Sequence, residues 1–332
     1  MQASENPQPT QPTIADYACR SVAKSFKKII RNEVDVLSDR DIEALHQMRI
    51  GLRRLRTTIQ TFDPVFDFPD CVQDATLKPL AKRLGRVRDL DVLLLTLRED
   101  YRPHLSKKER KALDKILARL QKQRDRRFKQ MKHFLKGTEY EQQKDNLRDW
   151  LKHTRQINDS QPLALLPIHI AVPDLLLPVL SQTLLHPGWF AMPEASAIAV
   201  AREDESPEAI EAINHWFDHG GTILHDLRKQ IKKLRYQTEF FASLYDEPYQ
   251  RQVQEFKTIQ DTLGTLQDIW VLNQTLTRTA PKIWPKKLPS MAKQLQQDRW
   301  QTWLKWEGIR ADYGTTEKRS NLRQMILNPI ER

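Results

Sequence analysis

Residues 46–56 of the chain read HQMRIGLRRLR, and residues 225–235 read HDLRKQIKKLR. In both stretches a histidine is followed by cations three, seven and ten positions later, and the stretches lie 179 residues apart. Residues 84–97 and 263–276 form a second pair with the same offset, and seven of their 14 positions are identical. Because a constant offset leaves no net insertion between the two motifs, we infer that each half contains the same helical hairpin.

The histidine and the three cations of each stretch share one side of a helix over about 15 Å, within a sector about 80° wide. The apolar positions that face the core lie directly beside this row. A solvated helix face needs no fixed spacing of residue types, so the repetition favours a functional row. For the two histidines a packing role, with a ring N–H donated to a carbonyl, remains the alternative. The rows are His46, Arg49, Arg53 and Arg56 in the first half and His225, Arg228, Lys232 and Arg235 in the second.

The helix that follows each row repeats as well. Lys78, Lys82, Gly85 and Asp89 share a face by their spacing, and Gly85 has no side chain to hold the basic helix away. We expect Asp89 and Asp268 to be structural partners of the row arginines and not catalytic groups. At the same offset the second half keeps three of the four residues but is less basic, because Asp261 replaces Lys82 and Gln267 replaces Arg88; the repeated residues are Lys257, Gly264 and Asp268.

The composition is globular with a basic excess: 332 residues carry 54 Lys and Arg against 43 Asp and Glu, a net charge of +11. Single cores stop growing at about 250–300 residues, so two lobes are expected. Only nine glycines occur, with no G-x-x-x-x-G-K or G-x-G-x-x-G motif, which argues against turn-rich β architectures and common nucleotide-binding loops. The two cysteines, Cys19 and Cys71, are typical of a reducing, intracellular compartment.

Catalytic and metal-binding patterns are missing from the sequence, which has no G-x-S-x-G, H-E-x-x-H or C-x-x-C motif. Asp89 and Asp91 suggest a metal site, but Trp270 stands where the repeat of Asp91 would need a carboxylate. We therefore expect no metal, no cofactor and no enzymatic activity.

Apolar residues at three- and four-residue steps predict a helical protein. The expected divisions are a disordered leader (1–13), a first half (14–157), a Pro-rich connector (158–173) and a second half (174–328). Five prolines interrupt the most apolar stretch, 162–190, so no membrane span is expected, and residues 196–201 are the best strand candidate. The predicted helices are 14–34, 39–62, 73–98, 106–136, 139–156, 174–185, 207–217, 222–245, 249–277 and 290–309.

Residues 107–136 form a separate basic feature, with 13 Lys and Arg against three Asp and Glu. The apolar positions of this predicted helix lie on one stripe, so most of its charge is expected to face solvent. Two interpretations stay open here: a long solvated helix, or a face that binds an anion.

With its duplicated His-x-x-Arg-x-x-x-Arg/Lys-x-x-Arg row and duplicated Leu-Gly-x-x-x-Asp segment, the chain resembles the CHAD family, the conserved histidine α-helical domain, from about Ile14 to Leu327. The resemblance implies an all-α fold of two four-helix bundles with pseudo-two-fold symmetry. It further implies a shared central groove that binds inorganic polyphosphate, and localisation at polyphosphate granules. The implied groove residues are His46, Arg49, Arg53, Arg56, Lys78, Lys82, His225, Arg228, Lys232, Arg235 and Lys257.

The residues themselves fit this ligand, because a linear chain of phosphates needs a long track of guanidinium and ammonium groups. A histidine beside such a polyanion should be biased toward its charged form. Two alternatives remain. The first is a nucleic-acid-binding protein that uses helix 107–136, although no reading motif and no aromatic stacking set are present. The second is a phosphohydrolase acting on polyphosphate or triphosphate, although no carboxylate cluster suited to Mg²⁺ is evident.

Overall fold

The computed structural model describes residues 11–153, 161–191 and 207–330 of the chain, and within these ranges it is helical without a β-strand. The helices are α1 (Ile14–Ser38), α2 (Ile42–Phe62), α3 (Asp74–Thr96), α4 (Lys107–Leu135), α5 (Thr138–His153), α6 (Ile168–Leu184), α8 (Pro207–Gly220), α9 (Thr222–Phe240), α10 (Glu247–Thr279), α11 (Pro289–Tyr313) and α12 (Thr316–Leu327). None of the described helices is long and apolar enough to cross a membrane.

Local capping chemistry sets several helix ends. Thr13 and Asp16 form a capping box at the start of α1, and Ser106 and Glu109 form another at the start of α4. Each box satisfies backbone N–H groups that the first helical turn leaves without partners. Helix α1 ends where Asp39 adopts a left-handed conformation with φ of 56°, which short polar side chains tolerate better than most.

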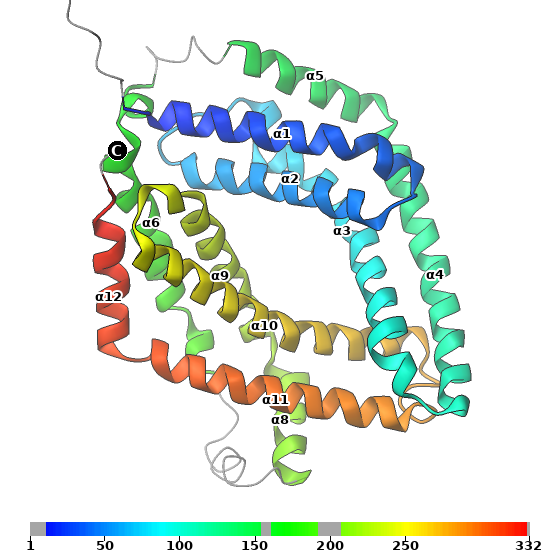
Figure 1. Cartoon of the computed structure of the whole chain (residues 1–332). Helices are drawn as coiled ribbons and strands as arrows, with labels where there is room; N and C mark the ends of the chain where they lie inside the picture. Colours follow the sequence, from blue (N-terminus) through cyan, green and yellow to red (C-terminus); the bar gives the residue numbers. More distant parts are fainter. Residues whose placement is uncertain (1–10, 154–160, 192–206, 331–332) are drawn as a thin grey trace, which may run out of the picture.

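Four helices face the middle of the molecule: α2, α3, α9 and α10 (Figure 1). Outer helices pack against them, α1 on α2, α4 on α3, α6 on α9 and α11 on α10. The inner four are the helices that carry the two repeated sequence motifs. The fold therefore places the motifs of both halves around one central space.

The hydrophobic core is shared between the two halves. One cluster contains Met48 of α2 together with Leu227 of α9, and the other contains Leu113 of α4 together with Leu272 of α10. At the ends of α2 and α9, the rings of Phe62 and Phe240 meet edge to face with centroids 5.6 Å apart. Because each cluster takes side chains from both halves, neither half packs around a core of its own, and the relative position of α2 and α9 is fixed by packing.

The connector was predicted wrongly: α6 begins at Ile168, inside the range 158–173 assigned to it, and continues through Pro173 and Pro178. Each internal proline costs about 3 kcal/mol. Nine buried residues along α6 offset this cost, since a buried Leu, Val or Ile contributes about 1.5–3 kcal/mol. Residue Thr13 of the predicted leader caps α1 and bridges to Pro167.

Two features of the remaining chain complete the comparison with the sequence. Trp300, Trp303 and Trp306 of α11 are buried helix-packing residues. Helix α12 was not predicted, because Leu322 and Ile326 are its only buried residues and leave little apolar periodicity. Residues 1–10 of the leader and the strand candidate 196–201 lie outside the described residues.

Candidate functional site

A central cavity of about 1110 Å³ lies between α2, α3, α9 and α10. Eight lysines and arginines line it against three aspartates, so its wall is strongly positive. The cations come from both halves of the chain: Arg49, Arg53, Arg56, Arg88, Arg228, Lys229, Lys232 and Lys233. His46 and His225 also contribute to the lining. The structure thus brings seven of the eight predicted row residues to one cavity.

The charges of the two rows act on one another across this cavity. Burial lowers the pKa of Lys232 to about 8, and the positive charges of Arg228, Arg53, Arg49 and Arg56 contribute to the shift. Three of those four arginines belong to the first half. Lys232, which belongs to the second half, is therefore within electrostatic reach of the first row. An anion placed between the rows would interact with both.

The two histidines are held in their neutral form more strongly than usual. Burial lowers the pKa of His46, and the nearby cation of Arg88 lowers it further. Burial also lowers the pKa of His225, with Lys229 adding to the effect. The buried Nδ1 of His225 and the buried Nε of Arg228 have no hydrogen-bond partner among the described residues. Such unpaired polar atoms are costly unless a ligand or water completes their hydrogen bonds.

The repeated glycines make room for the row arginines. A Cβ added at Gly85 would stand 2.7 Å from Nη1 of Arg49, and one added at Gly264 would stand 3.3 Å from Nε of Arg228. The sequence predicted close approach at Gly85, and the structure shows what approaches: a guanidinium group lies over the bare helix surface. The Leu-Gly-x-x-x-Asp motif and the His-x-x-Arg motif are thus parts of one arrangement.

The repeated aspartates lie beside these arginines. Oδ1 of Asp89 is 3.8 Å from Nη2 of Arg49, which confirms the predicted pairing in the first half. Although 76% of the Asp89 side chain is exposed, the concave protein surroundings raise its pKa, an effect that the charge of Arg49 opposes. In the second half, desolvation raises the pKa of Asp268, and the charge of Arg228 opposes the rise.

Tyr236 links the rows of the two halves. The guanidinium carbons of Arg53 and Arg235 each lie 4.4 Å from the centroid of its ring. These cation–π contacts fix the planes of two arginines that come from different halves. Tyr101, the other aromatic residue in the cavity lining, donates its hydroxyl to Asp298 at 3.3 Å.

Two row arginines are engaged by polar protein groups. Arg56 lines the cavity but donates to both carboxylate oxygens of Asp74, at 2.6 and 3.0 Å, and these hydrogen bonds lower the pKa of Asp74. Arg235 does not line the cavity; its Nε donates to Gln260 at 3.0 Å and its Nη1 lies 3.5 Å from Glu239. Of the other cations in the lining, Arg49 pairs with Asp89 and Lys229 pairs with Asp226 at 2.9 Å. The cations of the lining that have no ion pair or hydrogen bond within the described ranges are Arg53, Arg88, Arg228, Lys232 and Lys233.

Comparison with known proteins agrees with this architecture. A family model described as the CHAD domain matches residues 20–277, more than half of the chain. The chain belongs to the CHAD family. A crystal structure of the CHAD domain from the plant Ricinus communis superposes with a TM-score of 0.57 at 22% identity, covering 100% of this chain and 99% of that one. This likeness shows a CHAD fold. None of the curated proteins compared with the chain matches it.

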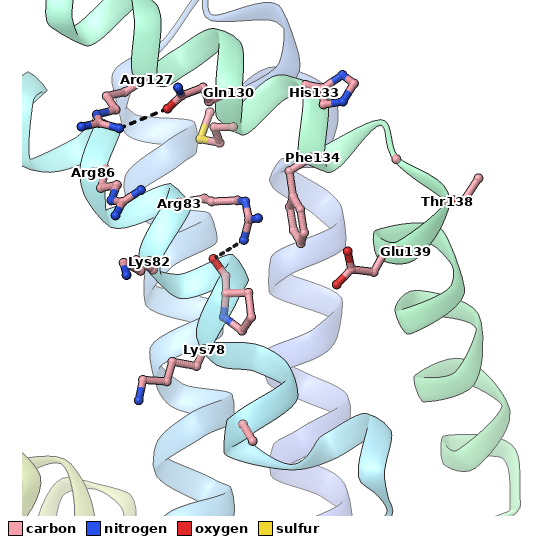
Figure 2. Close-up of a pocket in the computed structure, with 14 residues that line it drawn as sticks. Lys78, Lys82, Arg83, Arg86, Arg127, Gln130, His133, Phe134, Thr138 and Glu139 are labelled. Atoms are coloured by element: carbon pink, nitrogen blue, oxygen red, sulfur yellow. Dashed lines mark hydrogen bonds between the residues drawn. The ribbon is translucent and has the colours of Figure 1, made fainter.

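The remaining predicted residues of this CHAD domain lie outside the central cavity. Lys78 and Lys82 line a second cavity, of about 920 Å³, between α3, the end of α4 and the start of α5 (Figure 2). Lys257 is exposed on α10 and belongs to the lining of neither of these cavities. Helical spacing had grouped Lys78 and Lys82 with Gly85 and Asp89, but only the latter two lie beside Arg49 of the central cavity.

Sequence reasoning missed several cations of the CHAD cavity, namely Arg88, Lys229 and Lys233. Arg88 was noted only as a difference between the halves, although its position directly before the repeated aspartate was the available signal. The cations of the basic helix α4 are mostly exposed, as predicted, and this exposure fits both of the open interpretations. Arg124 is the exception, buried and paired with Asp39 and, at 2.8 Å, with Asp91. Over the described residues, no group of three or more His, Cys, Asp or Glu side chains is placed to hold a metal ion.

Proposed function

We propose that this CHAD protein binds inorganic polyphosphate in the central cavity. The observation that carries the proposal is the pair of basic rows, one from α2 and one from α9, that line the same cavity. A phosphate chain carries about one negative charge per unit along its whole length, and arginines can hold its oxygens in bidentate fashion. Membership of the CHAD family supports the same ligand class.

Symmetry is part of this proposal. We take α2 and α9, and likewise α3 and α10, as copies related by a pseudo-two-fold axis through the cavity, in a fold of two duplicated bundles. The constant offset of the motifs supports this relation, and so does the matched placement of Arg49 on Gly85 and Arg228 on Gly264. A linear ligand would then meet equivalent arginines from both sides.

The ligand is proposed to be bound and not cleaved, and granules of polyphosphate are the proposed location of the protein. Of the aspartates in the lining, Asp89 lies beside Arg49 and the charge of Arg228 acts on Asp268, so both are engaged with cations. A phosphate-release assay with and without Mg²⁺ tests this point. Steady release by the wild type that is lost on Asp89→Asn would replace binding with hydrolysis.

Polyphosphate is favoured over nucleic acid because both aromatic residues in the described lining are already engaged. The ring of Tyr236 is in contact with two arginines, and the hydroxyl of Tyr101 is bonded to Asp298, so the described lining holds no set of unengaged aromatic residues for stacking successive bases. The test is competition at fixed ionic strength, with labelled polyphosphate bound and single-stranded RNA added at matched phosphate concentration. Displacement by RNA as effective as by unlabelled polyphosphate would favour the nucleic-acid alternative.

The cavity itself is tested by the double change Arg49→Glu and Arg228→Glu. It places two negative charges on facing rows, and we expect polyphosphate binding to be lost while the circular dichroism of the helices is kept. The milder pair Arg49→Gln and Arg228→Gln guards against loss of folding and should weaken binding by about tenfold or more per lost contact. Wild-type affinity in either folded variant would exclude this cavity as the site.

A further inference from the structure

The cavity between α3, α4 and α5 is a second basic site beside the central one. Five lysines and arginines line it against a single carboxylate, that of Glu139, and His133 adds a titratable group (Figure 2). The five cations are Lys78, Lys82, Arg83, Arg86 and Arg127. With about 920 Å³ it is comparable in volume to the central cavity.

One cation of this cavity is held in place while others have no counter-charge. The guanidinium carbon of Arg83 lies 4.0 Å from the centroid of the Phe134 ring, and Nη1 donates to the carbonyl oxygen of Pro79 at 3.2 Å. Lys78, Lys82 and Arg86 form no ion pair or hydrogen bond through their side chains with any residue of the described ranges. A fixed guanidinium beside free cations is an arrangement suited to a multivalent anion.

The cations extend as a row along α3. Lys78, Lys82 and Arg86 are spaced by four residues, so they follow one another over about 12 Å of helix. Ala81 lines the central cavity and its neighbour Lys82 lines the second one. Successive residues of a helix point about 100° apart, so the two cavities adjoin neighbouring faces of α3.

The second half repeats only the first residue of this row, since Lys257 corresponds to Lys78. At the offset of 179 residues, Lys82, Arg83 and Arg86 correspond to Asp261, Thr262 and Thr265 of α10. The basic lining of the second cavity is therefore a property of the first half alone. A row that only stabilised the helical hairpin would be expected in both copies.

We propose that the α3–α4 cavity is a second site for phosphate groups, and that a polyphosphate chain long enough to cross α3 occupies both cavities at once. The second clause rests on the proposed function of the central cavity. Occupation of two linked sites by one ligand raises its apparent affinity without any new contact at the first site. The protein would consequently bind long chains more tightly than short ones. It would also bind them preferentially on the side of the first half, where the second cavity lies.

The test replaces two exposed residues of α3 by the residue types found at the corresponding positions of α10, with the double change Lys82→Asp and Arg86→Thr. The matched control is Lys122→Asp with Arg126→Thr, which makes the same change in net charge at exposed positions of α4 outside the cavity. Affinities for long polyphosphate are compared by titration calorimetry. We expect at least about a tenfold loss in the α3 variant and at most about a twofold loss in the control, whose charges are screened at physiological salt.

Histidine proton NMR reports on the cavities separately, with tripolyphosphate as the probe. His133 lines the second cavity, while His46 and His225 line the central one, and single His→Gln variants assign their signals. We expect tripolyphosphate to shift all three signals in the wild type and to leave His133 unshifted in the α3 variant.

Equal losses of affinity in the α3 variant and its control, or a His133 signal that tripolyphosphate does not move in the wild type, would overturn the second site. Failure of the proposed function, polyphosphate binding in the central cavity, would give a different result. The His46 and His225 signals would then not shift, and the Arg49 and Arg228 variants would keep wild-type affinity.

Discussion

Gly85→Ala is expected to weaken polyphosphate binding without lowering the stability of the fold. The added Cβ would stand 2.7 Å from Nη1 of Arg49, and ordinary contact begins at 3.4 Å, so the guanidinium must retreat by at least about 0.7 Å. A hydrogen bond tuned to 2.7–3.2 Å does not survive such a shift unchanged. Loss of one bond to a charged group costs about 1.5–3 kcal/mol, which is roughly a 10- to 150-fold loss of polyphosphate affinity.

The same change should not destabilise the fold. The displaced atoms are the far end of a flexible side chain, and alanine exceeds glycine in helix propensity by about 0.8–1 kcal/mol. Gly308→Ala is the control, because a Cβ there meets nothing within 4 Å on α11. Gly264→Ala should have an intermediate effect, as its closest contact, 3.3 Å to Arg228, is nearly ordinary.

Calorimetric titration with polyphosphate and urea unfolding of the three variants give the two readouts. We expect the affinity for polyphosphate to be highest in Gly308→Ala, lower in Gly264→Ala and lowest in Gly85→Ala, with no variant less stable than the wild type. Wild-type affinity in Gly85→Ala would refute the role given to the arginine over the glycine. A clear loss of stability in Gly85→Ala alone would show that Arg49 is held rigidly.

Four further predictions address charge. Because burial and Arg228 lower the pKa of Lys232 to about 8, polyphosphate affinity should fall as pH rises through that value, and Lys232→Arg should remove the fall in a pH series of titrations. The same shift predicts that the free protein gains stability between about pH 8 and 10.5, where the unfolded lysine still binds its proton, measurable by urea unfolding. Arg124→Met leaves buried Asp91 unpaired and should cost about 3–5 kcal/mol of stability, whereas exposed Arg126→Met should cost almost nothing. Neutralising exposed Lys122, Arg126 and Lys129 together should weaken polyphosphate binding less than the changes at Arg49 and Arg228; the reverse order would move the site to α4.

The sequence predicted the helical class and the facing of the rows because the repeat fixed residue types at helical spacing. His46, Arg49 and Arg53 reach the cavity along with their counterparts for that reason. Spacing within one helix says nothing about which helix lies opposite, so Lys78 and Lys82 could not be separated from the central site. The sequence also did not show which protein groups engage Arg235 instead of a ligand. Gln260 reaches it through the packing of α10 on α9, and Glu239 reaches it through the rotamer that the two side chains adopt.

Proline rules also failed where burial outweighed them. Pro173 was assigned to an irregular connector, but the buried side chains of α6 make the helix begin at Ile168 and continue through it. Helix α12 escaped notice for the opposite reason, as two buried residues leave almost no periodic signal. Both errors arise from packing against neighbours that a single sequence does not identify.

The contacts of Tyr236 bear on how fast a ligand can be captured. With Arg53 and Arg235 each held 4.4 Å from one ring, these side chains give up rotamer freedom when the chain folds and not when the ligand arrives. Encounter with a polyanion then requires little rearrangement, and long-range attraction guides it. Added salt should therefore slow association far more than it speeds dissociation, and Tyr236→Leu, by releasing the guanidinium group of Arg53 in the cavity, would diminish this difference.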